Sequence, residues 1–209
     1  PMPSGHQAQA DRRRRLTCVA KCMKVPCLSI LKFNLEHQDI VVDSYSIMRH
    51  QLLDNHLVHA VVGLAREAGR AILEVYERAG AISASSKADD SPLTEADLAA
   101  HRVLAAGLAA LPGGVPVVSE EDEASLAHRR PTGAFWLIDP LDGTKEFIAR
   151  NGEFTVNVAL VRDGEPVFGV VFAPVIDELF AGSHGLGAFR ERNGARASIR
   201  VAEIGRAHV

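Results

Sequence analysis

Residues 136–151 read WLIDPLDGTKEFIARN, and this stretch decides the fold of the chain. The apolar run over residues 134–138 predicts a buried strand. The run stops abruptly at Asp139, and the next residue, Pro140, has no N–H to donate to a neighbouring strand. We therefore expect the strand to end at Asp139 and a turn to follow it.

Two carboxylates, those of Asp139 and Asp142, lie three residues apart at the end of this strand. Two buried like charges are costly unless a cation lies between them, and carboxylates are common ligands of divalent metals. Asp142 and Gly143 predict a tight turn, and Thr144 predicts the first residue of a short helix. The free N–H groups of Gly143 and Thr144 would suit a phosphate. One turn thus offers metal ligands together with an anion site.

The composition is that of an ordinary globular protein. The 209 residues suffice for one or two domains with a hydrophobic core, and 47% of them are hydrophobic. A net charge of -3 weighs against a nucleic-acid binder, and no apolar run approaches the roughly 18 residues of a transmembrane helix. The three cysteines all lie near the N-terminus, so no disulfide framework supports the remaining chain. This cysteine distribution suits a reducing cytoplasm, and we expect a cytoplasmic protein. Peripheral attachment to the inner membrane is left open, as is the oligomeric state.

Residues 1–47 differ from the rest, with a basic run at residues 12–15 and no clear signal-peptide pattern. Their cysteine spacing matches no zinc pattern. We expect a disordered or spurious extension, with Met48 as the true start. Residues 48–203 carry the regular patterns of a folded domain, whereas residues 204–209 look like a translated adapter sequence. We therefore expect the natural protein to continue beyond this point.

Apolar residues recur at spacings of three and four between residues 52 and 75, which predicts a long amphipathic helix that Gly80 ends. This helix is expected to serve packing and no chemistry. Residues 81–93 predict a polar loop. Such a loop is usually only a connection, but beside a phosphate site it would act as a lid, with Asp89 as an additional metal ligand.

A second helix is predicted to begin near Thr94, with an apolar face made by Leu104, Leu108 and Leu111. Thr94 with Asp97 three residues later resembles a capping box. Acidic residues also suit a helix N-terminus. This structural role explains Asp97 without any function.

Residues 115–118 predict a short strand that runs into the acidic cluster Ser119-Glu120-Glu121-Asp122. An acidic cluster is usually a solvated loop. Here, however, it follows an apolar strand, as Asp139 does. Two adjacent strands that end in carboxylates would converge on one metal, and the sequence leaves both interpretations open.

Alternating apolar residues predict strands at residues 154–161, 166–172 and 179–182, with a further candidate at 188–190. Asp163-Gly164 predicts a hairpin turn between the first two. We expect these strands to build a sheet behind the site. The sequence contains no Walker glycine loop, GxSxG elbow or HExxH pair.

Two of these motifs resemble one family. SEED at residues 119–122 and DPLDGT at residues 139–144 resemble the magnesium-dependent, lithium-sensitive inositol monophosphatase superfamily. Residues 86–94 and 145–157 resemble its bacterial 3'(2'),5'-bisphosphate nucleotidase branch, the CysQ type. The resemblance covers about residues 48–201. It implies a layered α/β (α+β) sandwich of two subdomains, with the first present here and the second truncated.

The resemblance also implies roles for individual residues. Two or three Mg²⁺ ions would be bound by carboxylates and one backbone carbonyl, those of Glu120, Asp139, Asp142 and Leu141. Leu141 and Asp142, with the Gly143 and Thr144 amides, would form the substrate-phosphate site.

The catalytic residues implied by the resemblance are Thr144, Asp97 and Glu120. Thr144, hydrogen-bonded to Asp97, would orient or help to deprotonate the attacking water. Such a role for Asp97 is compatible with helix capping.

The activity implied is that of a phosphoric monoester hydrolase, which removes the 3'-phosphate of adenosine 3',5'-bisphosphate to give AMP and phosphate and is linked to sulfate assimilation. An inositol monophosphatase or sugar-bisphosphatase is the first alternative. The family also uses an aspartate in a downstream Trp-Asp motif, which this chain lacks. A non-catalytic metal- or phosphate-binding fragment is therefore the second alternative.

Overall fold

The computed structural model describes residues 55–78, 84–86, 92–183 and 186–200. The expectations made for residues 1–47, Met48, Asp89 and residues 204–209 concern parts of the chain outside the described residues, and they stay predictions.

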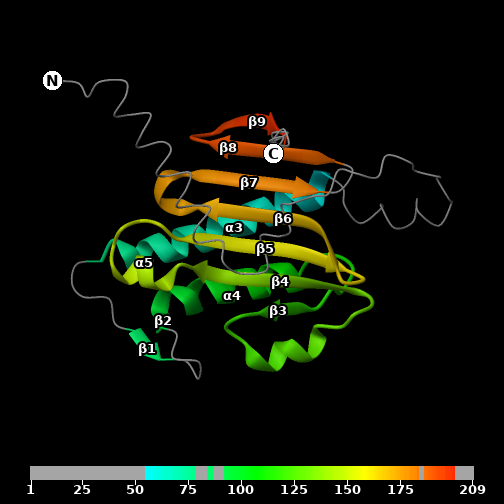
Figure 1. Ribbon diagram of the computed structural model, residues 1–209, viewed down its shortest axis with the longest axis horizontal. Coiled ribbons are helices and arrows are strands. Elements are labelled where there is room, and N and C mark those ends of the chain that lie inside the picture. Colours follow the sequence, from blue (N-terminus) through cyan, green and yellow to red (C-terminus); the bar gives the residue numbers. More distant parts are fainter. Residues whose placement is uncertain (1–54, 79–83, 87–91, 184–185, 201–209) are drawn as a thin grey trace, which may run out of the picture.

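A seven-stranded mixed sheet forms one layer of the molecule (Figure 1). The strands lie in the order in which they occur in the sequence, from β3 to β9. The β3–β4 pair is parallel, and each later pair is antiparallel. The strands are β3 (Val117–Ser119), β4 (Ala134–Asp142), β5 (Thr155–Arg162), β6 (Glu165–Ala173), β7 (Glu178–Ser183), β8 (Gly187–Arg192) and β9 (Ala195–Ile199).

The alternating patterns after the central turn are confirmed as β5, β6, β7 and β8. The hairpin at Asp163-Gly164 is confirmed as well, since both residues have positive φ, at 52° and 81°, as a tight hairpin turn requires. Strand β9 was not predicted. Its sequence, ARASI, lies on the exposed edge of the sheet and lacks the apolar alternation that burial imposes on the inner strands.

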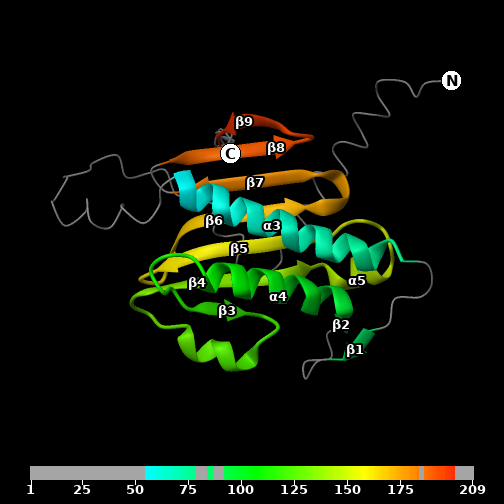
Figure 2. The ribbon, with the colours of Figure 1, turned by 180° about the vertical axis from the view of Figure 1, so that it is seen from behind.

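Two helices cover one face of the sheet (Figure 2). They are α3 (Asn55–Tyr76) and α4 (Glu95–Ala109), and a third, short helix α5 (Thr144–Ile148) follows β4. The remaining elements are a small antiparallel hairpin of β1 (Ala84–Ser86) and β2 (Pro92–Thr94) and the 3-10 helices η2 (Glu123–His128) and η3 (Pro174–Ile176). The described part of the chain contains no helix that is long and apolar enough to cross a membrane. Helices layered on a mixed sheet confirm the α/β sandwich.

One hydrophobic core fills the space between these two helices and the sheet. The periodic residues expected to face it do so, including Val61, Ile72, Leu104 and Leu108, whereas Leu111 is only partly buried. The sheet side is built by alternate residues of the inner strands, among them Trp136, Ile138, Val158, Leu160, Phe168 and Val170.

Helix α3 ends at Tyr76, before the Gly80 that was expected to end it, and Gly80 lies outside the described residues. A side chain from another element contacts the chain where the helix ends. The guanidinium of Arg150, which follows α5, donates to the backbone carbonyls of Tyr76 and Arg78, at 2.5 and 2.8 Å. The carbonyls at a helix C-terminus need partners from outside the helix, and here a distant arginine supplies one for the last residue of α3.

The contact between α3 and β6 requires a glycine at position 69. A Cβ on Gly69 would lie 2.5 Å from the Phe172 ring, whereas a Cβ on Gly63 of the same helix would meet nothing within 4 Å. We predict that Gly69→Ala lowers the free energy of unfolding by about 1–3 kcal/mol, because the core is overpacked. Gly63→Ala should raise it by about 0.5–1 kcal/mol through helix propensity.

Urea unfolding of the two variants side by side measures both effects. Because the substitution is chemically the same, helix propensity contributes equally, and the difference reports the crowding of Gly69 against Phe172 and Pro174. Equal stability of the two variants would contradict the tight packing of α3 on β6.

Candidate metal and phosphate site

Parallel pairing of β3 and β4 brings two acidic strand ends together. Ser119 lies opposite Ile138 in the pairing, and the N–H of Glu120 donates to the carbonyl of Ile138 at 3.2 Å. Glu120 therefore lies beside the residue that precedes Asp139. This confirms that the two strands lie side by side and end at the same edge, next to α5 (Figure 1).

Strand β4 continues through Pro140 to Asp142, so the expectation that it ends at Asp139 is wrong. Asp139 lies opposite Asn157 and Asp142 opposite Thr155, so three steps along β4 match two along β5. This shift of register is a β-bulge, where a proline without an N–H is tolerated. The bulge keeps both carboxylates on the paired end of the strand instead of in a separate loop.

Gly143 connects β4 to α5 in a conformation that suits glycine alone. Its φ is 97°, and a Cβ would lie 2.9 Å from the backbone carbonyl oxygen of Glu153. Phe147 of α5 is fully buried, and its ring packs against those of Tyr76 and Phe154, with centroids 5.3 and 5.2 Å away. This aromatic cluster fixes the turn against the end of α3. The role of the Gly143 and Thr144 amides in phosphate binding stays a prediction.

Asp97 both caps α4 and contacts the turn. The Thr94 backbone N–H and hydroxyl donate to Asp97 Oδ2 at 2.8 and 2.5 Å, which confirms the capping box. The Thr144 hydroxyl donates to Asp97 Oδ1 at 3.2 Å. Burial raises the pKa of Asp97, opposed by the hydrogen bonds that Thr94 and Thr144 donate to it. The hydrogen bond that the resemblance implied is therefore present together with the cap.

The Thr144 hydroxyl has a second acceptor within reach, the Leu141 carbonyl at 3.3 Å. A hydroxyl has one proton and two lone pairs. When the proton points to Asp97, the oxygen can accept a hydrogen bond from a water molecule. The pair Thr144–Asp97 can therefore orient a water beside Asp142.

Asp142 is half-buried and holds an unfavourable charge. Desolvation raises its pKa from 3.8 to about 6, and repulsion from Glu120 and Glu146 adds to this, although Asn157 donates to Asp142 Oδ2 at 3.2 Å. The sequence had given no role to Asn157 or Glu146. Asn157 was detectable in principle, because it is a polar residue within a strand that is otherwise buried and apolar.

The acidic strand ends offer oxygen ligands to a metal without forming a closed cluster. Across the described residues, no three His, Cys, Asp or Glu side chains lie together closely enough to hold an ion by themselves. Carboxylates with a backbone carbonyl nevertheless form the hard oxygen set that Mg²⁺ prefers. A cation would also relieve the repulsion between Glu120 and Asp142. The residues therefore fit a divalent cation in their donor chemistry and charge, without forming a closed cluster.

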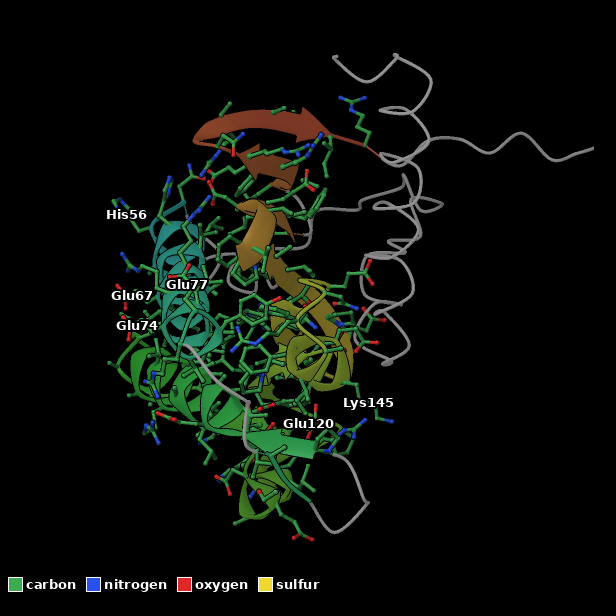
Figure 3. The ribbon with its side chains drawn as sticks, turned by 90° about the vertical axis from the view of Figure 1, so that its left-hand side faces the viewer. His56, Glu67, Glu74, Glu77, Glu120 and Lys145 are labelled. Carbon is green, nitrogen blue, oxygen red and sulfur yellow. The ribbon has the colours of Figure 1, made fainter. Side chains whose placement is uncertain are left out.

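Figure 3 places Glu120 and Lys145 on the opposite side of the molecule from the outer surface of α3, where Glu67 and Glu74 lie. Glu120 is exposed, whereas Asp139 is only 7% exposed. The site thus combines one solvent-facing carboxylate with one that the fold shields from water.

The raised pKa of Asp142 predicts a dependence of stability on pH in metal-free protein. A carboxyl whose pKa is raised by folding stabilises the fold when protonated, and this contribution is lost as pH rises through about 6. In EDTA, the free energy of unfolding of the natural chain should fall between pH 5 and pH 7.5. This fall should exceed that of Asp142→Asn by on the order of 1–2 kcal/mol, after allowance for solvent screening.

Urea unfolding at the two pH values tests this, with Glu165→Gln, an exposed carboxylate on the β5–β6 hairpin, as the matched control. Glu165→Gln should show the same fall in the free energy of unfolding as the natural chain. Parallel pH profiles for the natural chain and Asp142→Asn would refute a raised pKa of Asp142, and with it the burial and repulsion assigned to this carboxyl.

Comparison with known proteins agrees with this geometry. Residues 54–207 match the inositol monophosphatase family. The chain is 49% identical over 145 residues to the 3'(2'),5'-bisphosphate nucleotidase CysQ of Escherichia coli K12, a match that covers 69% of this chain and 58% of that protein. It is 37% identical over 147 residues to the CysQ of Buchnera aphidicola, covering 70% and 56%. The chain thus spans somewhat more than half the length of these relatives.

Solved structures of the same fold are also similar. CysQ from Bacteroides thetaiotaomicron gives a TM-score of 0.57 at 44% identity, over 68% of this chain and 51% of that one. The Thermotoga maritima IMPase gives 0.59 at 28% identity, over 72% and 55%. The family match covers most of the chain, the relatives and solved structures agree with it, and the chain belongs to the inositol monophosphatase family.

Proposed function

We propose that this chain carries the metal- and phosphate-binding part of a magnesium-dependent phosphatase that removes the 3'-phosphate of adenosine 3',5'-bisphosphate, giving AMP and phosphate. The observation that carries the proposal is the hydrogen bond from Thr144 to the buried Asp97, next to the strand ends that hold Asp139 and Asp142. The relatives named 3'(2'),5'-bisphosphate nucleotidase CysQ support this choice of substrate.

Glu120, Asp139, Asp142 and the Leu141 carbonyl would hold the Mg²⁺ ions, two or three in number, and Asp89 is a further candidate ligand. When bound, Mg²⁺ would neutralise phosphate oxygens and acidify a water molecule, which a reaction as slow as phosphate monoester hydrolysis requires.

The protein side of the reaction is the placement of water and phosphate. Asp97, held by two hydrogen bonds from Thr94, fixes the direction of the Thr144 proton. The Thr144 oxygen then accepts a hydrogen bond from the water that attacks phosphorus, and Asp97 is the group beyond it toward which the proton can move. Gly143 is the residue that lets the turn pass close to the Glu153 carbonyl, and its N–H with that of Thr144 would bind the phosphate.

The attack would be direct, without a phosphoenzyme. Residues 139–157 contain no cysteine or histidine that would act as the nucleophile. In-line displacement by the oriented water is therefore the simplest chemistry for this turn.

The proposed role is removal of a nucleotide by-product of sulfate assimilation, in the cytoplasm, with peripheral attachment to the inner membrane as an alternative location. We further propose that residues 48–203 are the first part of the catalytic domain. The alternatives differ in substrate or in activity. An inositol monophosphatase or sugar-bisphosphatase would use the same metal chemistry on another leaving group, and a binding fragment would hold metal and nucleotide without turnover.

Phosphate release from adenosine 3',5'-bisphosphate and from inositol 1-phosphate, at equal concentrations with Mg²⁺, tests the proposal. We predict faster release from the nucleotide. Asp139→Asn and Asp142→Asn should each reduce the rate at least about 100-fold, because even groups that only support metal ligands cost 10–100-fold when removed. Glu165→Gln should leave the rate unchanged.

Faster hydrolysis of inositol 1-phosphate would assign the chain to the first alternative. Binding of Mg²⁺ and nucleotide in calorimetry without phosphate release would support the binding fragment. Near-normal rates in both aspartate variants would contradict the assignment of Asp139 and Asp142 as Mg²⁺ ligands.

A further inference from the structure

Helix α4 presents two polar side chains toward the site, one turn apart. Asp97 and His101 are separated by four residues and so lie on the same face of the helix. Asp97 reaches Thr144, at the end of β4. His101 Nδ1 lies 2.8 Å from the hydroxyl oxygen of Ser119, at the end of β3. A single helix face therefore contacts both acidic strand ends.

Ser119 is the last residue of β3 and is 2% exposed. Its hydroxyl oxygen also accepts the N–H of Glu121, at 3.2 Å, so the side chain joins α4 to the residue after Glu120. The Ser119 backbone N–H donates to Ser125 Oγ at 2.9 Å, and its carbonyl accepts the N–H of Asp122 at 3.2 Å. The turn that carries Glu120 is thus held at Ser119 by side-chain and backbone hydrogen bonds.

Glu120 itself is exposed, and its backbone is fixed on both sides. Its N–H bonds to the carbonyl of Ile138 at 3.2 Å, and the next N–H, that of Glu121, bonds to the Ser119 hydroxyl. The direction in which the Glu120 side chain leaves this turn depends on these two contacts. The hydroxyl in turn is held by His101, which comes from α4 on the core side of the sheet.

We propose that His101 is a positioning residue for Glu120, acting through the Ser119 hydroxyl. The inference rests on the proposed function, because it assigns His101 a role toward the cation that Glu120 would bind. Neither a buried apolar contact nor the helix cap accounts for this histidine. Ala100, Leu104 and Leu108 supply the apolar face of α4, and Thr94 with Asp97 supplies the cap.

The test compares His101→Phe, which keeps a planar ring but removes the nitrogen, with His101→Asn. The amide of Asn lies as many bonds from Cα as Nδ1 does, and it can donate or accept, so it serves whichever ring tautomer is present. His59→Phe is the matched control, because His59 is exposed on α3 and its ring contacts a backbone carbonyl of its own helix.

Two quantities are measured on the 209-residue chain: the Mg²⁺ dissociation constant by calorimetry, and the hydrogen exchange rate of the Glu121 amide in EDTA. His101→Phe should weaken Mg²⁺ binding about 10-fold, as loss of a group that orients a metal ligand does. It should also raise the hydrogen exchange rate of the Glu121 amide, while the exchange rates of the α3 amides stay unchanged. His101→Asn should restore most of both values, and His59→Phe should change neither.

Ser119→Ala provides a second route that avoids a larger aromatic ring in a packed region. It should reproduce the weaker Mg²⁺ binding, and His101→Phe should add little to it, because residues that act through one contact are not additive. Fully additive effects of Ser119→Ala and His101→Phe on Mg²⁺ affinity would overturn the inference, as would an unchanged affinity in His101→Phe. Either result would leave the proposed function standing. If the natural chain binds no Mg²⁺, the metal part of the proposed function fails, and the inference fails with it.

Discussion

The partial burial and mutual repulsion of carboxylates at the paired ends of β3 and β4 are the physical cost that the fold of this site imposes. Asp142 is partly desolvated, and the charges of Glu120 and Glu146 disfavour its ionised form further, so its pKa rises to about 6. A fold selected for stability alone would separate these groups or leave them in water. Here the sheet holds them together, because Glu120 and Asp139 follow neighbouring positions of two parallel strands.

The surrounding elements supply the rigidity that this arrangement needs. The apolar faces of α3 and α4 pack on the inner strands, and the ring cluster of Tyr76, Phe147 and Phe154 fixes the turn after β4. Helix α4 then contacts each acidic strand end by one side chain, Asp97 or His101. One core thus places both the charged groups and the polar groups that orient them.

The parts of the fold that depend on local pattern could be predicted from the sequence. Helical and alternating periods indicated α3, α4 and four of the strands, and the capping box of Thr94 with Asp97 was visible as a spacing of three residues. The family resemblance rested on short motifs, and its implied hydrogen bond between Thr144 and Asp97 is present.

The parts that depend on distant contacts were missed or wrong. Pro140 predicted the end of a strand, because a bulge that tolerates proline is a property of the pairing with β5 and not of β4 alone. Arg150 donates to backbone carbonyls at the end of α3, more than seventy residues earlier in the chain, and no local pattern shows this contact. The contacts of Asn157 with Asp142 and of His101 with Ser119 join separate elements, and no local spacing shows them.

The central claim is that this cluster of strand ends binds a divalent cation. Its most direct test is an anomalous difference map from crystals of the chain soaked in Mn²⁺, which takes the same oxygen ligands as Mg²⁺ and scatters anomalously. We predict a peak within about 2.0–2.6 Å of carboxylate oxygens of Glu120, Asp139 and Asp142. A map with no peak at this turn, with Mn²⁺ absent or bound elsewhere, would contradict the claim.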